Sequence, residues 1–129
     1  MEFRTLNNRD IPQIALWNVA LHVDEGSVPM SVPDAEARLR SWMATGKFSG
    51  SIFSLDGQAF GYILYEHLAA NPDMRGSTDS VYVRHFYVLP EYRRQGIGTD
   101  VFRRFQEEMG ETKMTLDVKV TNPAGQKFW

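Results

Sequence analysis

The chain has 129 residues, no cysteine and a formal net charge of −2. That length suits one domain around one core, and the missing cysteine excludes disulfides, thiolate metal sites and a cysteine nucleophile. A nucleic-acid-binding protein would carry a basic excess, and no apolar run reaches membrane-spanning or signal-peptide form. We therefore expect a cytoplasmic protein without a nucleic-acid or membrane partner.

The N-terminal third predicts one strand and two helices. Residues 2–6 alternate and read as a strand, and residues 7–22 follow with apolar side chains near helical spacing. Residues 31–46 predict the second helix, because Ser31 is a good N-terminal cap and Gly46 favours a stop.

The middle of the chain predicts a hairpin and a further strand. Residues 48–55 and 58–68 are strand-like and flank Asp56 and Gly57, a strong signal for a tight turn. A polar loop then leads to a β-branched and aromatic strand over residues 80–89.

The C-terminal third predicts a helix, a strand and the start of another helix. The first helix follows Gly98, carries an apolar stripe as far as Met109 and can end at Gly110. Residues 114–120 alternate as a strand does, and residues 122–129 resemble an opening helical turn.

This element order predicts an α/β (α+β) fold. Its meander favours a mostly antiparallel, twisted sheet with helices on its faces. The last strand–helix–strand unit should run parallel, with a right-handed crossover.

The segment RRQGIGT is the main candidate for a binding loop. It lacks the Walker lysine, and Val101 stands where a dinucleotide fingerprint would need its third glycine. An Arg-x-x-Gly-x-Gly loop at a helix N-terminus fits every residue, because unpaired N–H groups and the helix dipole favour an anion. The alternative is a simple turn with solvated arginines.

The wider segment VRHFYVLPEYRRQGIGTDVFRRF resembles the signature of the GNAT superfamily, the N-acyltransferases that use acetyl-coenzyme A (acetyl-CoA). The family pattern [Arg/Gln]-x-x-Gly-x-[Gly/Ala] maps onto Arg93, Gly96 and Gly98. The element order is also similar to the GNAT fold over nearly the whole chain. The resemblance implies acetyl-CoA as co-substrate, a small-molecule or peptide amine as acceptor, and no metal.

The resemblance also implies the residues that hold the cofactor. N–H groups from about residue 95 to 99 would bind the pyrophosphate, the arginines would face phosphates, and the strand backbone before the loop would pair with the pantetheine arm. The implied cofactor residues are Phe86, Tyr87, Val88, Arg93, Arg94, Gln95, Gly96, Ile97, Gly98, Thr99 and Asn122.

The end of the chain departs from the family pattern. Trp129 stands where the family often has a tyrosine that protonates the leaving thiolate, and an indole is not a usable acid. Family members usually continue with two more strands. We therefore expect a single domain over residues 1–129 that lacks the final hairpin and is incomplete at its C-terminus. Alternatively, a second copy of the chain completes the sheet in a homodimer.

His85 is the first candidate for the general base. An alkylammonium with a pKa of about 10.4 lies about 3.4 units from pH 7, so deprotonation costs roughly 4.6 kcal/mol. His85 lies on the strand before the loop, where many relatives carry an acid, and a histidine suits the task. The alternative is a packed histidine on a strand face shared with Val81, Val83 and Tyr87.

Glu66 is the second candidate, because it ends the neighbouring strand; the alternative is an exposed strand-end carboxylate. His67 should point to the opposite face. Asp24 and Glu25, between the two N-terminal helices, either attract a cationic amine or are solvated loop carboxylates.

The sequence therefore predicts an acetyl-CoA-dependent N-acetyltransferase in which a primary amine attacks the thioester directly within a ternary complex. The alternatives are a coenzyme A (CoA)-binding module or a partial domain with little or no turnover.

Overall fold

The computed structural model describes residues 1–28, 30–93, 96–110 and 113–116, the last four by their backbone. The predicted elements in these ranges are confirmed, and a 3-10 turn precedes the first helix. The elements are β1 (Glu2–Thr5), η1 (Asn8–Asp10), α1 (Ile11–Asp24), α2 (Val32–Thr45), β2 (Ser49–Leu55), β3 (Gln58–Leu68), β4 (Ser80–Val88), η2 (Pro90–Tyr92), α3 (Ile97–Met109) and β5 (Lys113–Leu116). The remainder of the predicted last strand and the helical turn at residues 122–129 lie outside the described residues.

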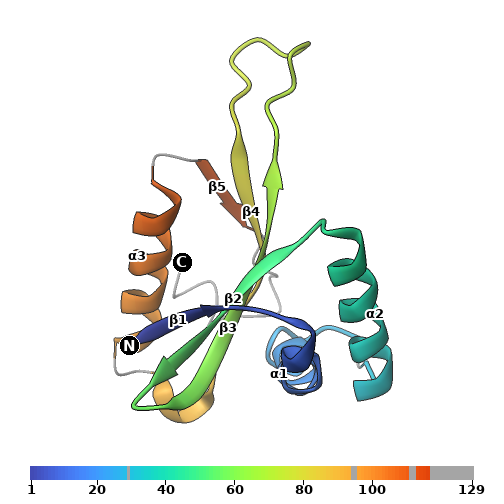
Figure 1. Cartoon of the computed structure of the whole chain (residues 1–129), viewed down its shortest axis with the longest axis vertical. Helices are drawn as coiled ribbons and strands as arrows, with labels where there is room; N and C mark the ends of the chain where they lie inside the picture. The colour runs from blue at the N-terminus through green and yellow to red at the C-terminus, as the bar shows by residue number, and fades with distance from the viewer. Residues whose placement is uncertain (29, 94–95, 111–112, 117–129) are drawn as a thin grey trace.

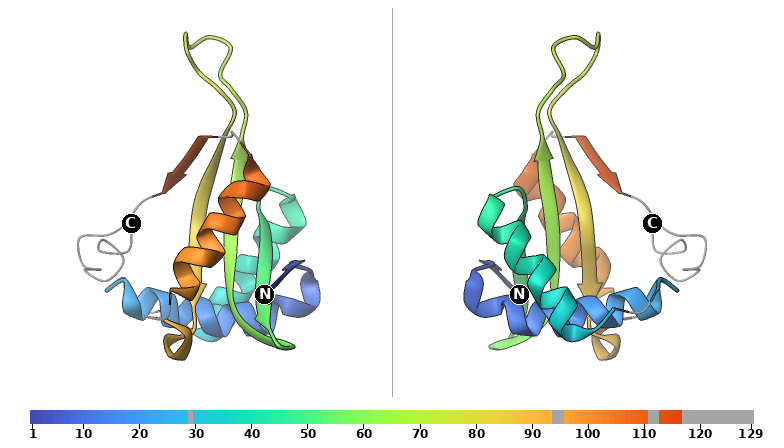
Figure 2. Two further views of the ribbon diagram at one scale, coloured as in Figure 1. Left: turned by 90° about the vertical axis from the view of Figure 1, so that its left-hand side faces the viewer. Right: turned by 90° about the vertical axis from the view of Figure 1, so that its right-hand side faces the viewer.

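The five strands form one sheet in the order β1-β2-β3-β4-β5. Neighbouring strands from β1 to β4 are antiparallel, whereas β4 and β5 are parallel. Helices α1 and α2 cover one face of the sheet and α3 covers the other (Figures 1 and 2). The predicted mixed, mostly antiparallel sheet with helices on its faces is confirmed.

Local signals in the sequence set the element boundaries. The Ser31 hydroxyl accepts a hydrogen bond from the Asp34 N–H (3.2 Å), which caps α2, and Gly46 ends that helix in the left-handed conformation (φ 67°). Asp56 and Gly57 both have positive φ (52° and 79°) between β2 and β3. A tight hairpin turn requires such angles, so the predicted turn is confirmed.

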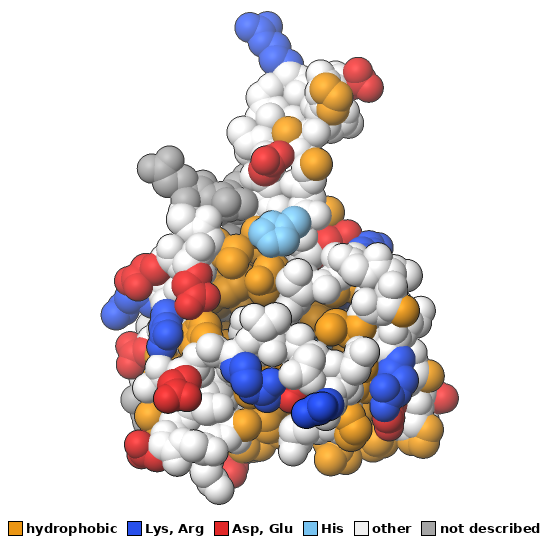
Figure 3. Space-filling view, viewed as in Figure 1, with side chains coloured by type: hydrophobic (Ala, Val, Ile, Leu, Met, Phe, Trp, Pro, Cys, Tyr) orange, Lys and Arg blue, Asp and Glu red, His pale blue; other side chains and the backbone are white. Residues whose placement is uncertain are grey.

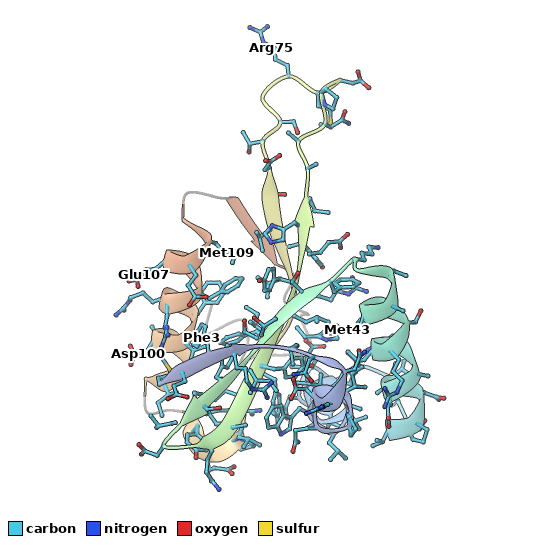
Figure 4. The ribbon with its side chains drawn as sticks, viewed as in Figure 1. Phe3, Met43, Arg75, Asp100, Glu107 and Met109 are labelled. Atoms are coloured by element: carbon cyan, nitrogen blue, oxygen red, sulfur yellow. The ribbon has the colours of Figure 1, made fainter. Side chains whose placement is uncertain are left out.

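Each face of the sheet has its own apolar core. The core under α1 and α2 contains the buried residues Leu6, Ile11, Ile14, Ala15, Trp17, Leu21, Ala35, Leu39, Phe48, Ile52, Tyr62, Leu64 and Tyr87. The core under α3 contains Phe53, Phe60, Ile63, Val81, Val83, Val88, Val101 and Phe105. In Figure 4, Phe3 of β1 lies towards α3, and its ring is 4.5 Å from the guanidinium carbon of Arg104.

A bulge interrupts the ladder between β3 and β4. Leu64 pairs with His85, but the next residue, Tyr65, pairs with Val83. Arg84 is therefore an extra residue in β4 with no partner directly opposite. Such a bulge reverses the alternation of side chains along the strand.

The bulge changes which residues lie on the same face of the sheet as His85. Val81 and Val83 pack in the core under α3, whereas Tyr87 packs under α1 and α2. His85 lies with Tyr87, because it contacts Asn18 of α1. The expectation that His85 shares a face with both valines is wrong, because it assumed unbroken alternation along β4.

The loop between β3 and β4 projects away from the body of the protein (Figure 1), and Arg75 lies at its tip (Figure 4). Hydrogen bonds within the loop support it: Asp79 accepts from the Ala70 N–H and Ser77 from the Asn71 N–H, both at 2.8 Å. Figure 3 shows this projection and, below it, acidic and basic side chains interspersed on the same face.

Candidate active site

β5 pairs with only the first part of the β4 edge. β5 pairs with β4 only from Ser80 to Val83. Within the described part of the chain, no strand pairs with this edge from Arg84 to Val88. The predicted cofactor-binding stretch from Phe86 to Val88 therefore lies on a part of the edge that no described strand occupies, and an edge of this kind can pair with the backbone of a ligand.

The N-terminus of α3 lies next along the chain. Gly96 takes the left-handed conformation (φ 76°) at the N-cap, and no side chain caps the helix. No atom lies within 4 Å of the position that a Cβ on Gly96 would occupy. Ile97, Gly98 and Thr99 form the first turn, whose N–H groups have no partner within the helix. This geometry suits an anion.

Three of the predicted cofactor residues, Arg94, Gln95 and Asn122, lie outside the described residues. Arg93 is described, and its side chain turns towards the protein. Its Nε donates to the Val88 carbonyl oxygen and its Nη2 to Asp24 Oδ2, both at 2.7 Å. Its guanidinium carbon also lies 5.3 Å from the centre of the Tyr87 ring. Arg93 therefore fastens the loop to β4 and α1 in this structure.

His85 belongs to a buried polar network that joins β4 to both N-terminal helices. It is 8% exposed. Asn18 Nδ2 lies 3.1 Å from His85 Nδ1 and 3.2 Å from the Tyr62 hydroxyl, and Arg38 Nη2 donates to Asn18 Oδ1 at 2.9 Å. Asn18 Nδ2 also lies 3.4 Å from His85 Nε2, and because an amide nitrogen only donates, the ring nitrogen that it reaches must accept.

Burial first, and then the charges of Arg38, His22 and Arg84, lower the pKa of His85 to about 3. The imidazole is therefore neutral at physiological pH. Burial also raises the pKa of the Tyr62 phenol, which stays protonated. Sequence reasoning missed Asn18, Tyr62 and Arg38, because a lone amide, phenol or guanidinium on a helix or strand carries no motif.

Glu66, the other candidate base, lies on the same face of β3 as Leu64 and pairs in register with Tyr82. Its carboxylate is 3.8 Å from Lys47 Nζ, and its side chain is 19% exposed. His67 lies on the other face, as predicted, because its ring contacts Tyr65 (5.5 Å between centres), which packs on Phe105 of α3. The structure does not bring Glu66 and His85 into direct contact.

A family model described as the acetyltransferase (GNAT) family matches residues 17–129. The chain belongs to this family. No curated protein sequence shows a significant match to it.

Solved structures share the GNAT fold of this chain. A possible acetyltransferase from Clostridium difficile 630 has a TM-score of 0.79 at 20% identity, covering 98% of this chain and 85% of that one. A predicted acetyltransferase from Clostridium acetobutylicum with acetyl-CoA has a TM-score of 0.71 at 19% identity, covering 98% and 87%. An aminoglycoside N-acetyltransferase in complex with CoA also has a TM-score of 0.71, at 18% identity, covering 98% of this chain and 82% of that one.

Two kinds of feature are missing from the described ranges of this GNAT domain. None of its described helices combines the length and the apolar character needed to cross a membrane. Within the same ranges, His, Asp and Glu side chains do not gather in threes or more as they would around a metal ion.

Proposed function

We propose that this chain transfers an acetyl group from acetyl-CoA to a primary amine, which attacks the thioester directly in a ternary complex. The observation that carries the proposal is the succession of two features along the chain: a β4 edge that no described strand occupies from Arg84 to Val88, and then a helix N-terminus at Gly96 that no side chain caps. The solved GNAT structures that contain acetyl-CoA or CoA support the choice of cofactor.

In this proposal the first turn of α3 holds the pyrophosphate. N–H groups of Gly96, Ile97, Gly98 and Thr99 donate to phosphate oxygens, and the open space beside Gly96 lets them approach. Gln95 and Arg94 act in the same loop, and Arg93 holds that loop in place through Val88 and Asp24.

In the same proposal, the acetyl-carrying arm lies along the edge of β4. Backbone groups of Phe86, Tyr87 and Val88 pair with the amides of the pantetheine chain as an added strand would. Asn122 contacts the same arm. This places the thioester near the bulge at Arg84, beside the buried network around His85.

The proton of the attacking amine requires an acceptor. An alkylammonium (pKa about 10.4) would pass its proton to a histidine of pKa about 3 at a cost of roughly 10 kcal/mol. We therefore propose that neutral His85 positions the reacting groups and that Glu66, the more exposed of the two, passes the proton on to solvent water. Glu66 is two residues beyond Leu64, which faces His85, or about 7 Å along the strand, so a bridging water is needed.

A second candidate is a CoA-binding domain with little turnover. The low basicity of His85 favours it, because the chemical step then depends on Glu66 alone among the candidate bases.

One pair of measurements separates the two candidates. The melting temperature is recorded with and without acetyl-CoA, and release of free thiol is followed with a panel of primary amines. An enzyme shows a saturable rise in melting temperature and amine-dependent thiol release. Stabilisation without thiol release favours the binding domain, and no stabilisation of the folded chain contradicts both.

A further inference from the structure

Two arginines lie against the same tryptophan on the α2 side of the sheet. The guanidinium carbon of Arg38, in α2, is 4.7 Å from the centre of a Trp42 ring, and that of Arg84, at the β4 bulge, is 5.7 Å from it. The Trp42 ring is in turn 5.8 Å from the His85 imidazole. The bulge thus places Arg84 beside the same tryptophan as Arg38 of α2, near the proposed reaction site.

Neither of these arginines has a counter-ion within the described part of the chain. Five other described arginines form ion pairs with carboxylates: Arg4, Arg40, Arg93, Arg103 and Arg104. Arg38 Nη2 instead donates to Asn18 Oδ1 (2.9 Å) and lies 3.0 Å from His22 Nε2. Its Nε is buried and has no hydrogen-bond partner among the described residues.

The two positive charges also act on each other. Burial lowers the pKa of Arg38 first, and the charge of Arg84 lowers it further. A partly buried guanidinium beside a like charge is destabilised unless an anion or further hydrogen bonds offset the loss of hydration. An arginine also presents its donors in a fork that matches a carboxylate.

We propose that Arg38 and Arg84 bind a carboxylate group of the acetyl acceptor, so that the acceptor is an amine that also carries a carboxylate, such as an amino acid. This inference rests on the proposed function. Arg84 and His85 both lie close to the Trp42 ring (5.7 and 5.8 Å to its centre), so the amine and the carboxylate of one small molecule reach the two positions together. The competing view is that Arg84 is only a solvated side chain stacked on Trp42.

Matched ligands provide the test. Glycine, phenylalanine and glutamate are each compared with their α-carboxamide, which keeps the amine and removes the α-carboxylate. Thiol release gives kcat/KM, and calorimetry in the presence of CoA gives binding without turnover. We expect at least one acid to be preferred over its amide by about tenfold or more, as the loss of a charge-assisted pair predicts.

Arg84→Gln is the main variant, because Arg84 is exposed and its described contact is with Trp42 alone. We expect it to lower the acid-to-amide preference about tenfold through KM, and to leave the amide and CoA affinities unchanged. Arg40→Gln is the control, since Arg40 is on the same helix and pairs with Glu36 (2.7 Å). Arg38→Gln should act as Arg84→Gln does, with its fold checked by melting because Arg38 also supports Asn18.

Each outcome decides a different question. Equal use and equal binding of acids and amides overturn the carboxylate site, as does an Arg84→Gln variant with unchanged preference. Weaker CoA binding by Arg84→Gln assigns Arg84 to the cofactor and also overturns it. If no amine releases thiol but acids still bind in an Arg84-dependent way, the proposed function fails and the carboxylate site stands.

Discussion

Arg93 and Asp24 are 69 positions apart in the chain, yet their side chains meet at 2.7 Å. The pair joins the C-terminal end of α1 to the loop that precedes α3. The end of α1 and the proposed cofactor loop are therefore held together by this ion pair. Asp24 thus has a role that neither interpretation of the sequence anticipated, because it serves a cation of the protein itself.

Disrupting this link should affect the cofactor more than the fold. Both side chains are more than a third exposed (38% and 40%), so Asp24→Asn should lower the free energy of unfolding by less than about 1 kcal/mol. Arg93→Ala also loses the bond to the Val88 carbonyl and should weaken CoA binding further than Asp24→Asn does. Calorimetry at low and high salt checks this order. Equal losses in the two variants would show that the Val88 contact does not matter.

Gly98→Asp should separate stability from cofactor binding. An acidic residue in the first turn of α3 interacts favourably with the helix dipole, by about 0.3–1 kcal/mol, so the melting temperature should be kept or rise. The same carboxylate would repel phosphates at that turn, so CoA binding should be lost. Gly98→Ala is the control that adds bulk without charge. Tight CoA binding by a folded Gly98→Asp protein would refute the loop assignment.

His85 should make stability depend on pH. Its pKa is about 3 in the folded protein, against about 6.5 unperturbed, so only the unfolded chain binds this proton between those values. The folded state is then fully favoured above pH 6.5 and loses stability as the pH falls towards 3, by at most about 1.4 kcal/mol per pH unit. The free energy of unfolding, measured with urea across this pH window, should depend less steeply on pH for His85→Gln than for the unmodified protein. An identical dependence would mean that His85 charges freely in the fold.

The same variant tests the positioning role of His85. Because a neutral imidazole throughout the working range contributes no limb to the pH–rate profile, His85→Gln should lower kcat and leave the profile's shape unchanged. Loss of a limb near pH 6.5 would instead restore His85 as the base.

Tyr62→Phe should destabilise the buried network. The Tyr62 side chain is fully buried, and its hydroxyl accepts from Asn18 Nδ2 at 3.2 Å. Removing the hydroxyl leaves a buried amide short of a partner, at a cost of about 1–3 kcal/mol in the free energy of unfolding. Tyr65→Phe, on the same strand but facing α3, is the matched control and should cost less. Comparable losses by urea unfolding would show that the network contributes little.

The fold was predictable because its signals are local. Alternation marks β2, β3 and β4, Ser31 and Gly46 bound α2, and Asp56 with Gly57 makes the hairpin. The first turn of α3 was found in the same way, because glycines and arginines before an apolar helical stripe form a contiguous pattern.

The polar network was not predictable, because its members meet only in the folded protein. Asn18 is 44 positions from Tyr62 and 67 from His85. The bulge at Arg84 carries no glycine or proline that would announce it, yet it decides which core His85 joins. Pairing across strands, and not any local preference, therefore sets the environment of the candidate catalytic residues.

The projecting loop between β3 and β4 lies, along the chain, between the two halves of the proposed site. Residues 71–76 at its tip are exposed, so a protease cut there should leave the sheet intact. One fragment would then carry α1, α2, Asn18 and Arg38, and the other would carry β4, Arg84, His85 and the glycine loop. Neither fragment holds both halves of the proposed site. The β3–β4 ladder, the shared core under α3 and the Asn18–His85 and Arg93–Asp24 contacts would bring them together, so recovery of CoA binding from two separately produced fragments would report on these contacts.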